Sequence, residues 1–494
     1  LLLSTLLLCT IATFENDDRT LFLIVETSKD AADALDRLAG SVVEIVNAAN
    51  KAHADWLTKF VVYAVDASGA RYSANSFDNV TDVQTQLSSL AAVASAAHAS
   101  DCNRDLTAVM IDAFRVFSPK DAHVILLSAG AGSMEPSDRQ LRTILEQFGT
   151  QPPVIDSIRL RRWDCKYAFN APFHDLLRVT HGLELSEEPH QLRYMLAGIL
   201  PTRYGISSRY SFVSPKKDTT KRNFTFAESL AERAFFYNNW SSEESVYILH
   251  KGDFPTAKPT YVEPGTSVYE MVGISQAVED VIVQISSDSE PLFTSIYFFG
   301  SNQVHLAYSD PANLTALYGA PTDNAANLLH VTLKSSLKTS GRATQAHITT
   351  IQNDGTPVTT TLPLVPQTGS DYEFVSSSTF TCAGEPGPRE INIEGVADDG
   401  KPFIRQFFTF CVLREHATTG SPATELVPVN TIAPVSSAVT TSVPASAASL
   451  APASSAQPVS VTSPDVASTT SASAASLIPV TNSSSAPVTM PTDG

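Results

Sequence analysis

The sequence predicts a multidomain protein: a doubly wound α/β region with a parallel sheet, followed by two all-β modules and a disordered tail. From about residue 20 to 200, buried apolar strands alternate with amphipathic helical patterns, which is typical of a parallel sheet covered on both faces. After Leu200, short alternating runs separated by turn residues replace the helices, as in all-β modules. From about residue 415 the chain is mainly Ser, Thr, Ala, Pro and Val, a composition with too little apolar surface to offset the entropy of ordering.

Each element of the α/β region has its own signal. The helix expected at 30–52 places Leu35, Leu38 and Val42 on one face, which is the spacing of an amphipathic helix. Strands are expected at 20–27, 60–66, 123–130 and 152–160, and further helices at 80–94, 106–117, 138–149, 171–182 and 186–200.

Changes in pattern along the chain set the expected domain boundaries. The 494 residues are enough for about three domains at roughly 150 residues each. The last β region has the strand spacing of a seven-strand sandwich. The expected units are a signal-peptide remnant at 1–13, an α/β domain at 18–202, a β-rich module at 206–312, an immunoglobulin-like β-sandwich at 325–413 and the tail at 415–494.

The N-terminal run LLLSTLLLCTIAT predicts secretion. It fits the apolar core of a secretory signal and is too short to span a membrane; the alternative is a buried first strand. Five sequons for N-glycosylation agree with an extracellular protein. Their asparagines are Asn79, Asn223, Asn239, Asn313 and Asn482.

Composition limits the partners and the character of the tail. The net charge of −18 argues against nucleic-acid binding, which needs basic patches on the phosphate backbone. Ser and Thr together with Pro predict an O-glycosylated, mucin-like stalk; an unmodified flexible tail is the alternative. The rest of the chain contains no stretch long and apolar enough for a membrane-spanning helix.

Apart from Cys9 in the leader, the chain has four cysteines, Cys102, Cys165, Cys382 and Cys411. In a secreted protein an even number suggests two disulfides, with three connectivities open, and buried free thiols are the alternative. Cys102 and Cys165 both follow the carboxyl ends of predicted parallel strands, so a bridge between them is geometrically reasonable. Cys382 and Cys411 would staple the last β module.

The sequence offers little catalytic chemistry. It lacks a Gly-x-Ser-x-Gly elbow, a His-Glu-x-x-His motif and a Cys-x-x-Cys pair. His174, His181 and His190 are irregularly spaced on predicted helices, where surface or partly buried histidines are the simpler reading. We therefore expect a non-enzymatic protein without a cofactor.

Oxygen-bearing side chains gather where the predicted parallel strands end. Glu26, Ser28 and Asp30 follow the first strand, and Asp101 lies in a later loop. Open α/β sheets bind ligands at this edge, and Mg²⁺ or Ca²⁺ needs oxygens converging from several loops. The edge is therefore the candidate metal or contact site.

These features resemble the von Willebrand factor A domain, and in particular the N-terminal head of hemicentins. The likeness rests on the first strand with its acidic-Ser cluster, the loop SDC, the strand VILLSAG and the segment RRWDCKYAFNAPFHDLLRVTHGLELSEEPHQLRYML. INIEGVADDGKPFIRQFFTF is similar to the last β segment of such heads, so the likeness covers roughly 20–413. The resemblance supports the pairing of Cys102 with Cys165.

The metal loops depart from the pattern of that family. Its first loop reads Asp-x-Ser/Thr-x-Ser; here Glu26 replaces Asp, Ser28 matches and Asp30 replaces the last Ser. Ser128 and Ala129 stand where the third-loop Asp is expected, and Ser100 or Asp101 could substitute for the second-loop Thr. We expect no tight metal site, with a weak Ca²⁺ or Mg²⁺ site as the alternative.

The resemblance implies a secreted protein that contacts extracellular matrix or cell-surface proteins through the rim of its A-like domain. The alternative is a mucin-like coat or matrix component without a specific ligand, in which the tail dominates behaviour. An enzyme would require a site that the sequence does not show.

Overall fold

The chain is described here from a computed structural model. The expected leader and tail, with Asn482, lie outside the residues that the structure describes. These residues are 19–130, 132–133, 135–150, 152–162, 164–165, 170–204, 206–214, 219–225, 231–239, 245–250, 258–263, 266–272, 280–286, 292–300, 302–335, 341–352, 356–382, 387–397, 400 and 402–413.

A six-stranded sheet forms the centre of the N-terminal region. Its strands are β1 (Arg19–Glu26), β2 (Leu57–Val65), β3 (Arg71–Phe77), β5 (Ala122–Ser128), β7 (Val154–Leu160) and β8 (Glu184–Glu187). Their order is β3-β2-β1-β5-β7-β8, and every neighbouring pair is parallel except β2 and β3. The region is thus α/β with a mixed, mainly parallel sheet.

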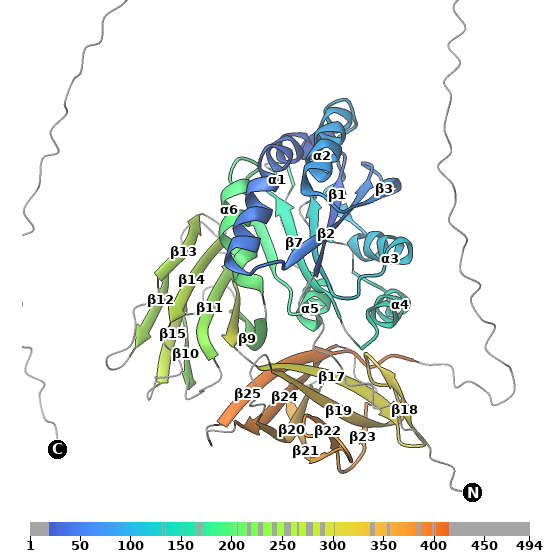
Figure 1. The fold of residues 1–494 in the computed structure, drawn as a ribbon, viewed down its shortest axis with the longest axis vertical. Coiled ribbons are helices and arrows are strands. Elements are labelled where there is room, and N and C mark those ends of the chain that lie inside the picture. Colours follow the sequence, from blue (N-terminus) through green and yellow to red (C-terminus); the bar gives the residue numbers. More distant parts are fainter. Residues whose placement is uncertain are drawn as a thin grey trace, which may run out of the picture. The chain divides into compact units, whose positions relative to one another are not determined.

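Helices cover both faces of this sheet (Figure 1). Alternate residues of β1 point to opposite faces, so Leu21 and Leu23 belong to one core cluster and Phe22 and Ile24 to another. The first cluster includes residues of α1 (Ala32–Ala52), α2 (Val80–Ser95) and α6 (Leu192–Ile199). The second includes residues of α3 (Leu106–Val116), α4 (Asp138–Phe148) and α5 (Ala171–Val179).

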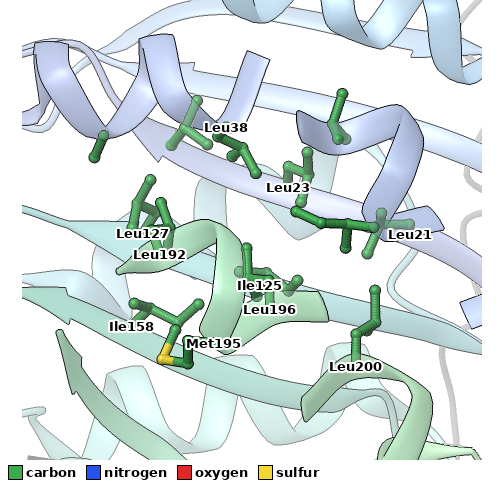
Figure 2. Packing of buried hydrophobic residues seen from close by; sticks show 14 of the residues in the cluster. Leu21, Leu23, Leu38, Ile125, Leu127, Ile158, Leu192, Met195, Leu196 and Leu200 are labelled. Atoms are coloured by element: carbon green, nitrogen blue, oxygen red, sulfur yellow. The ribbon is translucent and has the colours of Figure 1, made fainter. Parts of the chain in front are cut away.

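Leucine side chains join the helices to the sheet on the first face. Figure 2 shows Leu38 of α1 beside Leu23 of β1, and Leu196 of α6 beside Ile125 of β5. Each of these side chains is buried. Burying one large aliphatic side chain contributes about 1.5–3 kcal/mol, so this cluster is a main source of stability for the region.

Two strands of the sheet are absent from the sequence prediction. β3 is a partly exposed edge strand of mostly polar residues, RYSANSF, without an apolar alternation. β8 reads ELSE, and its last two residues fall in the helix expected at 186–200, of which only Leu192–Ile199 is α-helical. β8 is nevertheless buried. Arg159 and His174 lie 3.5 and 3.6 Å from the carboxylate oxygens of Glu184 and offset the cost of burying its charge.

The first β module consists of two antiparallel sheets. One has the order β10-β15-β12 and the other β13-β14-β11-β16-β9. Phe235, Tyr237, Val268 and Tyr297 of this module belong to the same core cluster as α1 and α6. The strands are β9 (Ile206–Ser214), β10 (Thr219–Thr225), β11 (Ala231–Asn239), β12 (Ser245–His250), β13 (Lys258–Glu263), β14 (Thr266–Val272), β15 (Asp280–Ser286) and β16 (Leu292–Gly300).

The last β module begins earlier than expected. Its strands are β17 (Asn302–Asp310), β18 (Asn313–Tyr318), β19 (Ala326–Ser335), β20 (Arg342–Ile351), β21 (Pro357–Pro366), β22 (Glu373–Ser376), β23 (Phe380–Thr381), β24 (Arg389–Val396) and β25 (Pro402–Thr409). β17 was expected in the module at 206–312, but it pairs with β19 over eight residues. The module boundary therefore lies near residue 301 rather than between 312 and 325.

One strand connects the two halves of this last sheet. β21 pairs with β20 through residues 357–363 and with β22 through residues 364–366. Buried side chains from both halves form one core cluster, which includes Leu333, Ile348 and Phe403. The module is a nine-stranded sheet, with β23 joined to β19 off the main path, whereas seven strands were expected.

A buried ion pair lies at the amino-end edge of the α/β sheet. Asp156 of β7 accepts hydrogen bonds from Nε and one terminal nitrogen of Arg203, at 3.1 and 2.8 Å. It also contacts His123 Nε2 at 3.0 Å and accepts from the Leu183 backbone N–H. Burial would raise the pKa of Asp156, but Arg203 and His123 outweigh it, so the pKa is lowered.

Arg203 also connects the α/β region to the first β module. It ends the 3₁₀ helix η2 (Leu200–Arg203), from which the chain continues toward β9. Its guanidinium carbon lies 4.7 Å from the ring centroid of Tyr297 and 5.3 Å from that of Tyr237. Burial raises the pKa of Tyr237 to about 12, so this ring remains neutral beside the cation.

We expect the stability of the protein to fall as the pH is lowered below about 6.5. Burial lowers the pKa of His123, and burial together with nearby cations lowers the pKa of His181 to about 3. In the unfolded chain these imidazoles protonate near 6.5, so the unfolded state binds more protons below that pH. Below that pH, each histidine lowers the free energy of unfolding by up to about 1.4 kcal/mol per pH unit.

The measurement is urea unfolding from pH 7 to 4 in chloride buffers. His181 has a φ of +54°, which Asn tolerates, so His181→Asn should fold and reduce the pH slope by the contribution of one histidine. A slope equal to that of the wild type would contradict the assignment.

Candidate functional site at the carboxyl-end rim

The carboxyl ends of the parallel strands form a polar rim. β1 ends at Glu26 and β5 at Ser128, and a short parallel ladder joins the loop after β5 to the loop before α3. The ladder pairs β4 (Asn103–Arg104) with β6 (Gly132–Ser133). This rim contains the residues predicted to hold a metal ion.

Glu26 is directed into the protein. Its side chain is 1% exposed, and Oε1 lies 3.2 Å from a terminal nitrogen of Arg104. Oε2 accepts hydrogen bonds from the Ala129 backbone N–H at 3.0 Å and from Ser128 Oγ at 3.3 Å. The Ser and Ala that stand in place of an acidic third loop thus bind the first-loop carboxylate.

Arg104 is the cation of the rim. Its two terminal nitrogens donate to the carbonyl oxygens of Asp66 and Ala67 at 2.9 and 2.6 Å. The nitrogen that faces Glu26 also donates to Ser100 Oγ at 2.6 Å. The Arg104 side chain is 5% exposed. Its guanidinium therefore supplies a buried positive charge beside the predicted ligand Glu26.

A second arginine lies beside Asp30. Asp30 Oδ2 accepts from the Ser100 backbone N–H at 2.7 Å and lies 3.1 Å from Arg162. Arg162 also makes two bonds to Asp164, at 3.0 and 2.7 Å, and these lower the pKa of the Asp164 carboxyl. Asp30 is thus part of a hydrogen-bonded loop contact.

The four predicted ligands do not form one ligand set in the described residues. Glu26 and Asp30 face different arginines, and Asp101 is exposed. Ser28 is buried, and its Oγ has no hydrogen-bond partner among the described groups. In the part of the chain that the structure describes, no group of three or more His, Cys, Asp or Glu residues is arranged to hold a metal ion.

A disulfide fixes the loops of the rim. Cys102 and Cys165 are bonded, with Cα atoms 5.3 Å apart, and Cys382 is bonded to Cys411 in the last module. The first bridge closes 63 residues, for which the chain-entropy model gives about 4 kcal/mol. The backbone of Gly130 packs closely against Cys102 of this bridge. A Cβ at Gly130 would lie only 3.0 Å from the carbonyl oxygen of Cys102.

Two sequon asparagines are exposed in the structure. Asn79 caps α2 by accepting a hydrogen bond from the Thr81 backbone N–H at 2.8 Å. Asn313 begins β18 and accepts from Thr315 Oγ1 at 2.9 Å. Their exposure is compatible with N-glycosylation, which remains a prediction. The side chains of Asn223, Asn239 and Asn482 lie outside the described residues.

Neither arginine of the rim was predicted from the sequence. Each lies within three residues of a cysteine, in DCNRD and RRWDC. A basic residue near the end of a parallel strand, opposite an acidic loop, is the signal that could have found them. Spacing alone could not pair Arg104 with Glu26, because the contact joins loops far apart in sequence.

Comparison with known proteins identifies one segment. Residues 301–417 match the family described as Irg-7-like, Ig-like domain, and this range coincides with β17–β25. No curated protein matches the chain. The C-terminal β module is therefore Ig-like, which together with the disulfides fits an extracellular protein and suggests a binding or adhesion role.

Two solved structures show weak likeness. A human COPII-coat protein is 7% identical with a TM-score of 0.28, and 80% of this chain aligns with 44% of that protein's length. The pilus adhesin SpaC from Lactobacillus rhamnosus GG, in an open conformation, is 7% identical with a TM-score of 0.26, and 78% of this chain covers 68% of it. TM-scores this low carry no argument about function. In the described residues, none of the helices is long and apolar enough to cross a membrane.

Replacing the buried arginine should destabilise the protein strongly. In Arg104→Ala, Glu26 loses its ion pair while remaining buried, a change that typically costs about 3–5 kcal/mol. The matched control is Arg142→Ala, whose partner Glu146 is half exposed and whose loss should cost less than about 1 kcal/mol. Chemical unfolding measures both values, and equal losses would show that the Glu26–Arg104 pair has no special weight.

We expect calorimetric titration of Ca²⁺ or Mg²⁺ into the full chain to give no binding at millimolar or tighter affinity. Arg104 already faces the carboxylate that a cation would need, and Mg²⁺ tolerates poor geometry badly. Saturable heat at millimolar concentration that is lost in Asp30→Asn would establish a metal site instead.

Proposed function

We propose that this chain is a secreted, non-enzymatic binding protein that contacts extracellular matrix or cell-surface proteins through the carboxyl-end rim. The resemblance of residues 20–413 to a hemicentin head, with its von Willebrand factor A domain, supports this role. The doubly wound sheet agrees with the fold that the resemblance implies. The Ig-like module and the two disulfides support an extracellular location.

The observation that carries the proposal is the prearranged state of the rim. Arg104 and Arg162 join its loops through hydrogen bonds and ion pairs, and the Cys102–Cys165 bridge closes it covalently. A surface fixed before binding loses little conformational entropy on association. Such a surface is suited to a specific protein contact.

The contact that we propose does not need a divalent ion. The carboxylate of Glu26 is neutralised by Arg104 and turned inward, so it is not presented to a partner. Lys29, Asp101, Asn103 and Asp164 are exposed on the surrounding loops. A partner would meet a mixed polar surface in which charge complementarity sets specificity.

The alternative is a mucin-like coat component. The composition of 415–494, rich in Ser, Thr, Ala and Pro, favours this role, because such a tail carries O-glycans and extends from a surface. A coat component would have no saturable partner.

A binding assay separates the two roles. The full chain is titrated onto matrix-producing cells with Ca²⁺ and Mg²⁺ or with a chelator. We expect saturable attachment that is unchanged by the chelator and about tenfold weaker in Asp101→Lys, because this exposed charge lies on the rim. The matched control is Asp371→Lys, an exposed acid of the Ig-like module, which should bind normally.

Other outcomes would overturn parts of the proposal. Attachment that is abolished by the chelator would indicate a metal-dependent rim. Attachment without saturation, equal in all variants, would favour the coat component.

A further inference from the structure

A cavity lies at the end of the α/β region opposite the rim. Its volume is about 80 Å³, and its lining comes from the amino end of β1, the C-terminal ends of α4 and α5, η2, and strands β17 and β25. One buried water needs roughly 10–15 Å³ measured this way. The cavity is therefore large enough for several waters or for one small polyatomic ion.

The ionisable side chains among the described residues that line this cavity are all of basic type. Arg19, His181 and Arg203 come from the α/β region, and His305 comes from β17 of the Ig-like module. The described residues that line it include no aspartate or glutamate. Burial first, and then the charges of Arg203, His305 and Arg19, lower the pKa of His181.

Asp156 leaves one terminal nitrogen of Arg203 without a hydrogen-bond acceptor. The carboxylate binds Nε and one terminal nitrogen, and the same terminal nitrogen donates to the His181 carbonyl oxygen. The Arg203 side chain is 0% exposed. Its other terminal nitrogen, NH1, is therefore buried, and it has no hydrogen-bond partner in the described structure. His181 Nδ1 is likewise buried without a partner. Buried donors without an acceptor are rare in folded proteins.

We propose that this cavity binds a small inorganic oxyanion of the sulfate or phosphate class. The anion would accept hydrogen bonds from Arg203 NH1 and His181 Nδ1, while Arg19 would add positive charge and the His305 imidazole lies beside them. A tetrahedral oxyanion has the several acceptor oxygens that such a set of donors requires.

The position of the cavity gives the anion a structural role. Of its basic groups, three belong to the α/β region and one to the Ig-like module, so the anion bridges the two. Other contacts already bring these modules together. His181 stacks edge-on against Phe407 at 5.2 Å, Arg178 lies 3.5 Å from the centroid of Phe408, and a Cβ on Gly319 would meet the Gly149 carbonyl oxygen at 1.8 Å. An anion in this contact stabilises the folded chain in proportion to its occupancy.

The test measures anion binding to the full chain after exhaustive dialysis into sodium chloride. Sodium sulfate and sodium phosphate are titrated by calorimetry, and thermal unfolding is followed at constant ionic strength. We expect one saturable site and a rise in unfolding temperature with sulfate or phosphate, and no rise with chloride at the same ionic strength. His305→Gln and Arg19→Gln should each weaken the anion affinity at least tenfold.

The control variant is Arg193→Gln, which removes an exposed arginine paired with Glu44 on α1 and should leave the affinity unchanged. If His305→Gln or Arg19→Gln fails to fold, the other variant and the wild-type comparison of sulfate with chloride still decide the question. A cavity that holds water alone would give no saturable heat. Equal stabilisation of every variant would indicate a general salt effect, and either result would overturn the proposal.

Discussion

The buried ion pair between Asp156 and Arg203 is the interaction on which the arrangement of the chain depends. Asp156 lies on β7 inside the sheet, and Arg203 lies where the α/β region passes into the first β module. The aspartate is held by an imidazole, a backbone N–H and a guanidinium, which offset the cost of burying its charge. The same guanidinium contacts Tyr237 and Tyr297, so one side chain couples the sheet to the module that follows it.

The two ends of the α/β sheet are organised by the same kind of group. At the carboxyl end, Arg104 neutralises Glu26 and bonds to two backbone carbonyls; at the amino end, Arg203 neutralises Asp156. Arginine suits both positions, because its planar guanidinium donates several hydrogen bonds and keeps its charge when buried. The two ends differ in what remains free. Both terminal nitrogens of Arg104 donate to acceptors of the rim, whereas the terminal nitrogen NH1 of Arg203, which belongs to the lining of a cavity, has no partner in the described structure.

The prediction succeeded where one physical signal dominated. The central strands are continuous apolar runs because both faces are covered, and α1 has a clear apolar face, so both are visible in the sequence. It failed for β3 and β8, which are polar strands at the edges of the sheet. It also placed β17 in the wrong module, because strand alternation says nothing about which strand is the partner. For the rim, residue types located the site at the strand ends but gave no information on which charges meet.

The sequence by itself determined that this protein has an α/β region followed by β-rich modules, and that acidic oxygens lie at the carboxyl ends of the strands. Local periodicity and composition act within a few residues, so they can be read without coordinates. The tertiary structure decided that Glu26 faces Arg104, that Asp30 faces Arg162, and that four basic groups from distant segments line one cavity. These pairings depend on contacts between residues far apart in the chain. In the low dielectric of the interior an unpaired charge is costly, so the fold must bring an opposite charge to it.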